Sequence, residues 1–145
     1  MAYPDLLNLA SEAEYMAHFK AGYCEKGSVT THGGLAVKFR ERHFKHAFFE
    51  AANRVEGDKS VFSTSRASRM NWISAALEDP SAELHQGFDN KKKCPCPNRR
   101  VSISNGNYVV IAEVEKSGEA TFVTAFVATA AALAKIRSNP KWNGK

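Results

Sequence analysis

Residues 101–127 read V-S-I-S-N-G-N-Y-V-V-I-A-E-V-E-K-S-G-E-A-T-F-V-T-A-F-V and decide the fold. Valine and isoleucine alternate with serine in the first part, which is typical of a strand with one buried face. Asn105-Gly106 favours the positive φ angles of a tight hairpin turn, and Ser117-Gly118 marks a second turn. β-branched and aromatic residues dominate the segments that follow these turns. The stretch therefore predicts three consecutive antiparallel strands.

Helical patterns recur in the chain before this stretch. Ser11 precedes Glu14 by three residues, the spacing of a capping box, which predicts a helix that ends near Gly22. Asp79-Pro80 is expected to end a later helix, because proline disfavours helical backbone in the residue before it. Helices are predicted at 12–21, 41–54, 65–78 and 128–136, with short extended segments at 35–39 and 61–62. This order predicts an α+β domain, in which N-terminal helices pack on a C-terminal antiparallel β-meander of about four strands.

The bulk composition indicates one globular domain. The chain has 145 residues, of which 43% are apolar and 24% are charged. No apolar run is long enough to span a bilayer, and the first residues lack the basic and apolar regions of a secretory signal. We expect a single domain over 1–145, with an acidic accessory segment at 1–37 and the core at 38–138.

The net charge of +5 is unevenly distributed along the chain. Residues 1–37 carry two lysines against four carboxylates, which gives −2 and leaves +7 for the remainder. A basic body favours a polyanion such as RNA, DNA or an acidic protein as a partner. The alternative is an ordinary basic surface without a dedicated partner.

A basic, proline-containing segment lies just before the meander. Residues 91–100 read K-K-K-C-P-C-P-N-R-R, and the prolines predict a loop without regular structure. Its five cations are candidate nucleic-acid ligands: Lys91, Lys92, Lys93, Arg99 and Arg100. Cys94 and Cys96 are one residue too close for the usual C-x-x-C zinc spacing, and the total of three cysteines is odd. We interpret both as reduced thiols, with a metal knuckle as the alternative.

The candidate catalytic stretch is residues 40–50, R-E-R-H-F-K-H-A-F-F-E. On a helix, His43 and His46 share one face, while Phe44 and Phe48 share another face that can be buried. Histidine titrates near neutral pH, which suits proton transfer. Three nearby cations are further candidate nucleic-acid ligands: Lys38, Arg40 and Arg42. The alternative is an amphipathic helix with solvated basic residues and two exposed histidines.

Three further side chains carry candidate roles. Arg66 and Arg69 lie three apart at the start of the predicted helix 65–78, where the guanidinium groups and the helix dipole favour an anion such as phosphate. Two solvated arginines are the alternative. Thr124 lies in the middle of a predicted strand and could direct its hydroxyl into a groove, although β-propensity alone explains a threonine there.

Histidine, arginine and hydroxyl groups together suit cleavage of RNA by its own 2′-hydroxyl. A base takes the 2′-hydroxyl proton, positive charge stabilises the phosphorane, and an acid protonates the leaving 5′-oxygen, so this chemistry requires no metal and no cofactor. The sequence contains no phosphate-binding glycine loop with lysine, no G-x-S-x-G and no H-E-x-x-H motif.

Three motifs in order carry a family resemblance: R-H-F-K-H-A-F at 42–48, R-A-S-R-M-N-W-I-S-A-A-L-E-D-P at 66–80, and Y-V-V-I-A-E-V-E-K-S-G-E-A-T-F-V-T-A-F at 108–126. Together the motifs resemble phage-borne or polymorphic-toxin branches of the barnase–EndoU–colicin–RelE (BECR) nuclease superfamily, over roughly residues 39–137. The resemblance implies helices before a four-stranded antiparallel sheet. It also implies a metal-independent endoribonuclease that acts as a toxin or as a phage or mobile-element effector.

The resemblance further implies roles for individual residues. His46 would be the base or the acid, Arg66 and Arg69 would bind phosphate, Thr124 would supply the strand hydroxyl, and the role of His43 stays open. The implied partners are RNA, such as tRNA or another structured RNA, and an immunity or antitoxin protein, with no membrane and with action in the cytoplasm of the producing or a target cell. The alternative function is a non-catalytic, basic nucleic-acid- or protein-binding module of phage origin.

Overall fold

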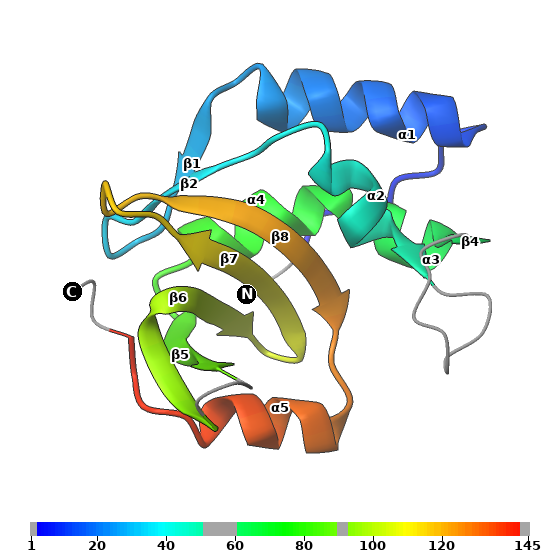
Figure 1. Ribbon diagram of the computed structural model, residues 1–145. Coiled ribbons are helices and arrows are strands. Elements are labelled where there is room, and N and C mark those ends of the chain that lie inside the picture. Colours follow the sequence, from blue (N-terminus) through cyan, green and yellow to red (C-terminus); the bar gives the residue numbers. More distant parts are fainter. Residues whose placement is uncertain (1–2, 51–60, 90–92, 143–145) are drawn as a thin grey trace.

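The computed structural model describes residues 3–50, 61–89 and 93–142, and places them around one mixed six-stranded β-sheet (Figure 1). The strand order in this sheet is β1-β2-β8-β7-β6-β5, and β3 and β4 form a separate short pair. The strands are β1 (Ser28–Thr30), β2 (Ala36–Lys38), β3 (Phe49–Glu50), β4 (Val61–Phe62), β5 (Glu83–Asp89), β6 (Cys94–Asn105), β7 (Tyr108–Val114) and β8 (Ala120–Val127). The helices are α1 (Glu12–Phe19), the π-helical turn η1 (Lys20–Cys24), α2 (His43–Phe48), α3 (Thr64–Ala67), α4 (Met70–Glu78) and α5 (Ala130–Arg137).

The predicted C-terminal antiparallel meander is confirmed and consists of β5, β6, β7 and β8. Both predicted turns are present. Gly106 and Gly118 adopt φ angles of 62° and 91°, which favour glycine. β2 adds to β8 in the parallel sense, with Val37 opposite Ala120, and makes the whole sheet mixed. The chain therefore belongs to the α+β class.

The helices before the meander cover one face of the sheet and α5 lies on the other. Phe19 of α1, Phe48 of α2 and Phe122 of β8 have no exposed surface and form one aromatic cluster. Arg137 of α5 lies 4.0 Å from Glu83 of β5, whereas the next residue, Leu84, packs against the core under the other helices. Successive strand residues point to opposite faces, so α5 lies on the face opposite those helices (Figure 1). The acidic segment 1–37 contributes to the same core through residues such as Phe19.

The predicted helix at 41–54 is wrong in its extent. α2 ends at Phe48, because Phe49 turns to extended backbone and pairs with Phe62 of β4. The helix propensity of the alanines in the sequence favours a longer helix, but local propensity does not report pairing with a distant strand. The predicted turn at Gly57-Asp58 lies outside the described residues.

Two other helix boundaries also differ from the predictions. The predicted helix 65–78 is divided into α3 and α4, and Arg69 between them has φ −97° and ψ 15°. The Ser63 hydroxyl caps α3 by accepting from the Arg66 amide, and α4 ends before Asp79-Pro80, as predicted. The first helix starts after its Ser11 cap, but continues past Gly22 as η1 instead of ending there.

The predicted loop at 91–100 is wrong from Cys94 onward. Cys94 to Arg100 belong to β6, and the register with β5 jumps from Gln86 opposite Val101 to Gly87 opposite Cys96. Proline is compatible with a strand at such an irregularity, where ladder hydrogen bonds are already interrupted. Lys91 and Lys92 lie outside the described residues. Within the described part of the chain, no helix is long and apolar enough to cross a membrane.

Candidate functional site

Helix α2 presents two histidines beside the edge of β8. Its apolar side, which includes Phe44 and Phe48, is buried against the core, as the four-residue spacing predicts. His43 is half-buried and His46 is exposed. Their ring centroids are 6.4 Å apart, in an edge-on arrangement. The helix therefore holds both imidazoles near one another while the phenylalanines fix its position.

His43 lines a polar pocket of about 340 Å³, together with charged side chains from three segments of the chain. The connection from β2 to α2 supplies two arginines, β7 and the turn after it supply one carboxylate each, and β8 supplies a threonine and a valine. The lining residues are Arg40, Arg42, His43, Glu113, Glu115, Thr121 and Val123. This is the one described pocket that combines an imidazole, guanidinium groups and carboxylates.

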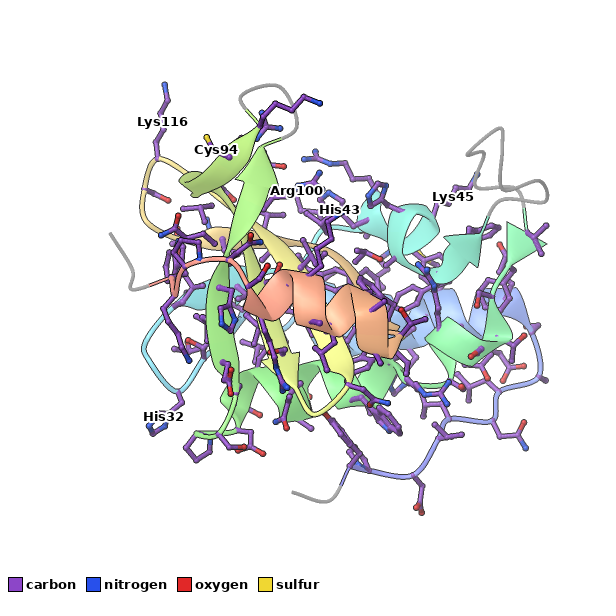
Figure 2. All side chains as sticks on the ribbon, turned by 90° about the horizontal axis from the view of Figure 1, so that it is seen from below. His32, His43, Lys45, Cys94, Arg100 and Lys116 are labelled. Atoms are coloured by element: carbon purple, nitrogen blue, oxygen red, sulfur yellow. The ribbon has the colours of Figure 1, made fainter. Side chains whose placement is uncertain are left out.

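The sheet extends this pocket as a row of polar residues. Glu113 of β7 is directly opposite Thr121 of β8 and Arg100 of β6, and Thr121 is opposite Lys38 of β2. Directly paired residues share a sheet face, so four neighbouring strands place alternating cationic, anionic and hydroxyl groups beside one another. Figure 2 shows Arg100 and His43 on the same side of the molecule.

The environment of His43 favours a neutral imidazole. Burial lowers the pKa of His43 below its usual value of 6.5, and the positive charges of Arg42 and His46 lower this pKa further. The negative charge of Glu113 acts in the opposite direction. The His43 Nδ1 atom is buried and has no hydrogen-bond partner among the described residues. At neutral pH this ring can therefore accept a proton.

The hairpin between β7 and β8 fixes the far wall of the pocket. The Thr121 hydroxyl donates to the Glu115 carboxylate, and the Glu115 amide donates to the Glu119 carbonyl over 2.8 Å. Lys38 lies 2.9 Å from Glu119, and this contact lowers the pKa of the Glu119 carboxyl. The Glu115 carboxylate is therefore bonded within the hairpin. Glu113 is exposed, and its negative charge acts on His43.

Sequence reasoning did not identify Glu113 and Glu115 as site residues. The two carboxylates are two positions apart, a spacing that places both on one face of an extended segment. Their approach to His43 depends on the pairing of β7 with β8, whose register shifts between Ile111 and Ala112. A bulge of this kind leaves no clear mark in the sequence.

The predicted phosphate ligands Arg66 and Arg69 line a different pocket, of about 170 Å³. The Arg69 Nη1 atom donates to the Ser65 carbonyl over 2.7 Å and to the Ser65 hydroxyl over 3.0 Å. The Arg66 guanidinium lies 5.8 Å from the centre of the Phe126 ring. The lining residues are Ser63, Ser65, Arg66, Arg69, Tyr108, Ala125, Phe126 and Val127.

Thr124 lies between the β8 segments that line these two pockets and lines neither of them. Its hydroxyl is buried and has no hydrogen-bond partner among the described residues. The structure therefore brings Arg40, Arg42 and His43 together and places His46 beside them. It separates Arg66 and Arg69 from this group and leaves Thr124 between the two.

The remaining predicted nucleic-acid ligands within the described residues are on the surface. Lys93, Arg99 and Arg100 are exposed, and Lys38 is paired with Glu119. Cys94 is an exposed thiol beside Lys93. Within residues 3–50, 61–89 and 93–142, no group of three His, Cys, Asp or Glu side chains is arranged to hold a metal ion.

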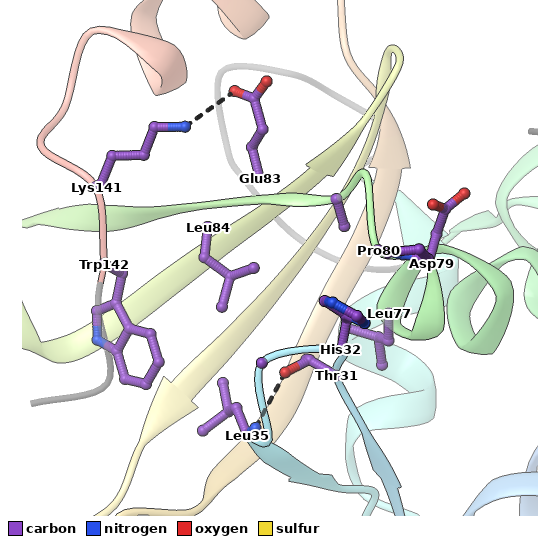
Figure 3. A pocket seen from close by; sticks show the side chains of 12 residues that line it. Thr31, His32, Leu35, Leu77, Asp79, Pro80, Glu83, Leu84, Lys141 and Trp142 are labelled. Carbon is purple, nitrogen blue, oxygen red and sulfur yellow. Dashed lines mark hydrogen bonds and ion pairs between the residues drawn. The ribbon is translucent and has the colours of Figure 1, made fainter.

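An apolar pocket of about 340 Å³ lies between the β1–β2 turn, the end of α4 and the start of β5 (Figure 3). Leu35, Leu84 and Trp142 form its apolar walls. Its two carboxylates are those of Asp79 and Glu83, and Glu83 lies 3.7 Å from Lys141. This lining is mainly apolar and has no guanidinium group among the described residues, whereas Arg40 and Arg42 line the His43 pocket, which is therefore the better candidate site for an anionic substrate.

Comparisons with known proteins add nothing to the geometry of the His43 pocket. No protein-family model, no curated protein and no solved structure matches this chain. The BECR resemblance therefore stays a prediction.

Proposed function

We propose that this chain is a ribonuclease-like domain that cleaves RNA by transesterification at the His43 pocket. The observation that carries the proposal is the convergence of His43, Glu113, Arg40 and Arg42 on one pocket. An imidazole and a carboxylate can move or stabilise a proton, and two guanidinium groups can bind a phosphate. The proposal keeps the reaction class that the sequence resemblance implies and changes the residues that perform it.

The proposed reaction starts with removal of the proton from the RNA 2′-hydroxyl by His43. The 2′-oxygen then forms a bond to phosphorus as the bond between phosphorus and the 5′-oxygen breaks. Arg40 and Arg42 stabilise the negative charge of the phosphorane, and Glu113 stabilises the imidazolium that His43 becomes. The products are a 2′,3′-cyclic phosphate and a 5′-hydroxyl end.

His46 is proposed as the acid that protonates the leaving 5′-oxygen. In an in-line displacement, the attacking and leaving oxygens are on opposite sides of the phosphorus, so the base and the acid cannot occupy the same place. Two imidazoles with centroids 6.4 Å apart satisfy this requirement from a single helix. The lowered pKa of His43 favours it as the base, because the neutral ring predominates at neutral pH.

The test is cleavage of a mixed RNA pool by the wild-type chain and by three variants, with and without a chelator. We expect chelator-resistant cleavage with 2′,3′-cyclic phosphate ends. His43→Ala and His46→Ala should each reduce the rate by roughly 10²–10⁴, as for loss of a general base or acid. Lys26→Gln, at an exposed position outside the pocket, is the control and should retain the wild-type rate.

Activity that requires Mg²⁺, or full activity in His43→Ala, would contradict the proposed mechanism. A wild-type chain that binds RNA but leaves it intact would instead support the non-catalytic binding module. Circular dichroism of each variant checks that a lost rate reflects lost chemistry and not unfolding.

A further inference from the structure

The smaller pocket, lined by Arg66, Arg69 and Phe126, is not used by the proposed cleavage mechanism. Two guanidinium groups and two serine hydroxyls line it, and no described lining residue is a carboxylate. The Arg69 Nε atom is buried and has no hydrogen-bond partner among the described residues. A buried donor of this kind is costly unless an acceptor reaches it, so the pocket is suited to an anionic oxygen.

Aromatic rings orient both guanidinium groups. Arg69 lies 5.1 Å from the centre of the Trp72 ring, and two hydrogen bonds to Ser65 hold its Nη1 atom. Arg66 lies over Phe126, which is half-buried. A guanidinium packed against a ring has a fixed plane, and the fork geometry of its N–H groups matches that of phosphate oxygens. Phosphate next to an aromatic surface is the chemistry of a nucleotide.

The two pockets are connected by one strand. Thr121 and Val123 of β8 line the His43 pocket, and residues 125–127 of the same strand line the smaller one. β2 pairs with β8 only at Ala120 and Thr121, and α2 and α3 also contact β8. Thr121 and Phe126 are five positions apart, or roughly 16 Å at the usual rise of a strand. This separation exceeds the reach of one nucleotide.

We propose that the smaller pocket is a second phosphate-binding subsite, and that the substrate is a single-stranded RNA segment longer than a dinucleotide that lies along β8. This inference rests on the proposed cleavage at the His43 pocket. Arg66 and Arg69 hold a phosphate that is remote from the scissile bond, and the intervening nucleotides span the distance between the two pockets.

The test compares kcat/KM for a dinucleoside monophosphate and for a hexanucleotide with the same scissile step. We expect the wild-type chain to prefer the hexanucleotide. Arg69→Gln should lower kcat/KM for the hexanucleotide by a factor of roughly ten or more, the usual loss for one charge-assisted hydrogen bond. The same variant should leave kcat/KM for the dinucleoside monophosphate unchanged. Arg66→Gln is the second variant, and Lys26→Gln is the charge-matched control that should alter neither value.

A second measurement separates failure of this inference from failure of the cleavage proposal. Binding of a 2′-deoxy hexanucleotide and a 2′-deoxy dinucleotide requires no catalysis. Weaker binding of the hexanucleotide alone in Arg69→Gln supports the subsite even if the wild-type chain cleaves no RNA. Equal losses for both lengths, or no loss for either, would overturn the subsite.

Discussion

The charges around His43 act on its protonation in opposite directions. Arg42, on the same helix end, disfavours the imidazolium, whereas Glu113, on β7, favours it. Burial of the ring outweighs the carboxylate, so the pKa of His43 is below its ordinary value. A base with this environment is ready to accept a proton at neutral pH, and an adjacent anion stabilises the charged form during the reaction.

We predict that charge-neutralising variants shift the His43 titration in opposite directions. Arg42→Gln removes a cation and should raise the pKa of His43, whereas Glu113→Gln removes an anion and should lower it. NMR titration of the imidazole resonances measures both shifts without reference to activity. Shifts of the same sign in the two variants would mean that Glu113 and Arg42 do not both face the ring.

His85 provides a second prediction, which concerns stability. Its ring is 3% exposed on β5, its Nδ1 atom has no described partner, and its pKa is lowered by burial and by Lys141 and Arg137, against an opposing effect of Glu83. Because the unfolded chain binds the proton more readily, stability is fully present above pH 6.5 and decreases as the pH falls through the lowered pKa.

Urea unfolding between pH 7.5 and pH 5 measures this effect. His85→Leu should show a smaller loss of unfolding free energy with acidification than the wild-type chain, and His32→Gln, at an exposed position, should keep the wild-type dependence. His43 contributes with the same sign, so the dependence should flatten without vanishing in His85→Leu. An unaltered pH profile in His85→Leu would assign the acid sensitivity to other groups.

At the residue scale, the sequence identified which residue types carry the site but not all of its members. His43 and the nearby arginines follow from the spacing of positions 40–46. Glu113 does not, because its position next to His43 depends on a strand register that tertiary pairing sets. Arg66 and Arg69 have the predicted helix-start positions, but a break in the helix at Arg69 places them in a separate pocket.

At the scale of elements, the irregular pairing of β5 with β6 depends on Gly87. A Cβ atom at this position would lie 2.7 Å from the Arg100 Cβ and 2.9 Å from the Arg100 carbonyl oxygen. Backbone and Cβ atoms cannot rotate away as the end of a long side chain can. Glycine therefore permits β5 to approach β6 where the register jumps, and this approach positions Arg100 opposite Glu113.

Gly87→Ala should destabilise the chain by about 1–3 kcal/mol, the usual cost of an overpacked site. Denaturant unfolding measures the change, and the backbone amide shifts of residues 99–101 report displacement of Arg100. Gly33→Ala is the matched control, because nothing lies within 4 Å of a Cβ at that turn and its φ is not in the glycine region. Wild-type stability in Gly87→Ala would mean that the β5–β6 approach is looser than these distances indicate.

The elements themselves were predictable to different degrees. The meander followed from alternation and two glycine turns, which are local signals that tertiary contacts reinforce. The extended proline segment of β6 and the early end of α2 did not, because strand pairing decides both. Local propensity is a weak guide where a distant strand supplies the hydrogen bonds.

At the scale of the whole molecule, charge is separated along the chain. Residues 1–37 are net negative and the remainder is +7. The cations Arg40, Arg42 and Arg100 gather around the His43 pocket or its extension across β6, and Lys93 and Arg99 are exposed on the same β5–β6 hairpin. A surface of this kind concentrates a polyanion near the pocket and accelerates its association.

The last prediction concerns this surface and its dependence on salt. Each phosphate contact that a single-stranded nucleic acid makes with a cation contributes about 0.7 to the slope of log K against log salt. Arg99→Gln combined with Arg100→Gln should therefore reduce the slope by up to about 1.4 and weaken binding at low salt. Fluorescence anisotropy with a labelled, cleavage-resistant 2′-deoxy oligonucleotide measures both quantities. Lys20→Gln combined with Lys26→Gln removes the same charge from the acidic segment and should leave the slope unchanged, because net charge alone does not create a contact. Equal slopes in the two double variants would show that Arg99 and Arg100 attract RNA only through the overall electrostatic field of the molecule.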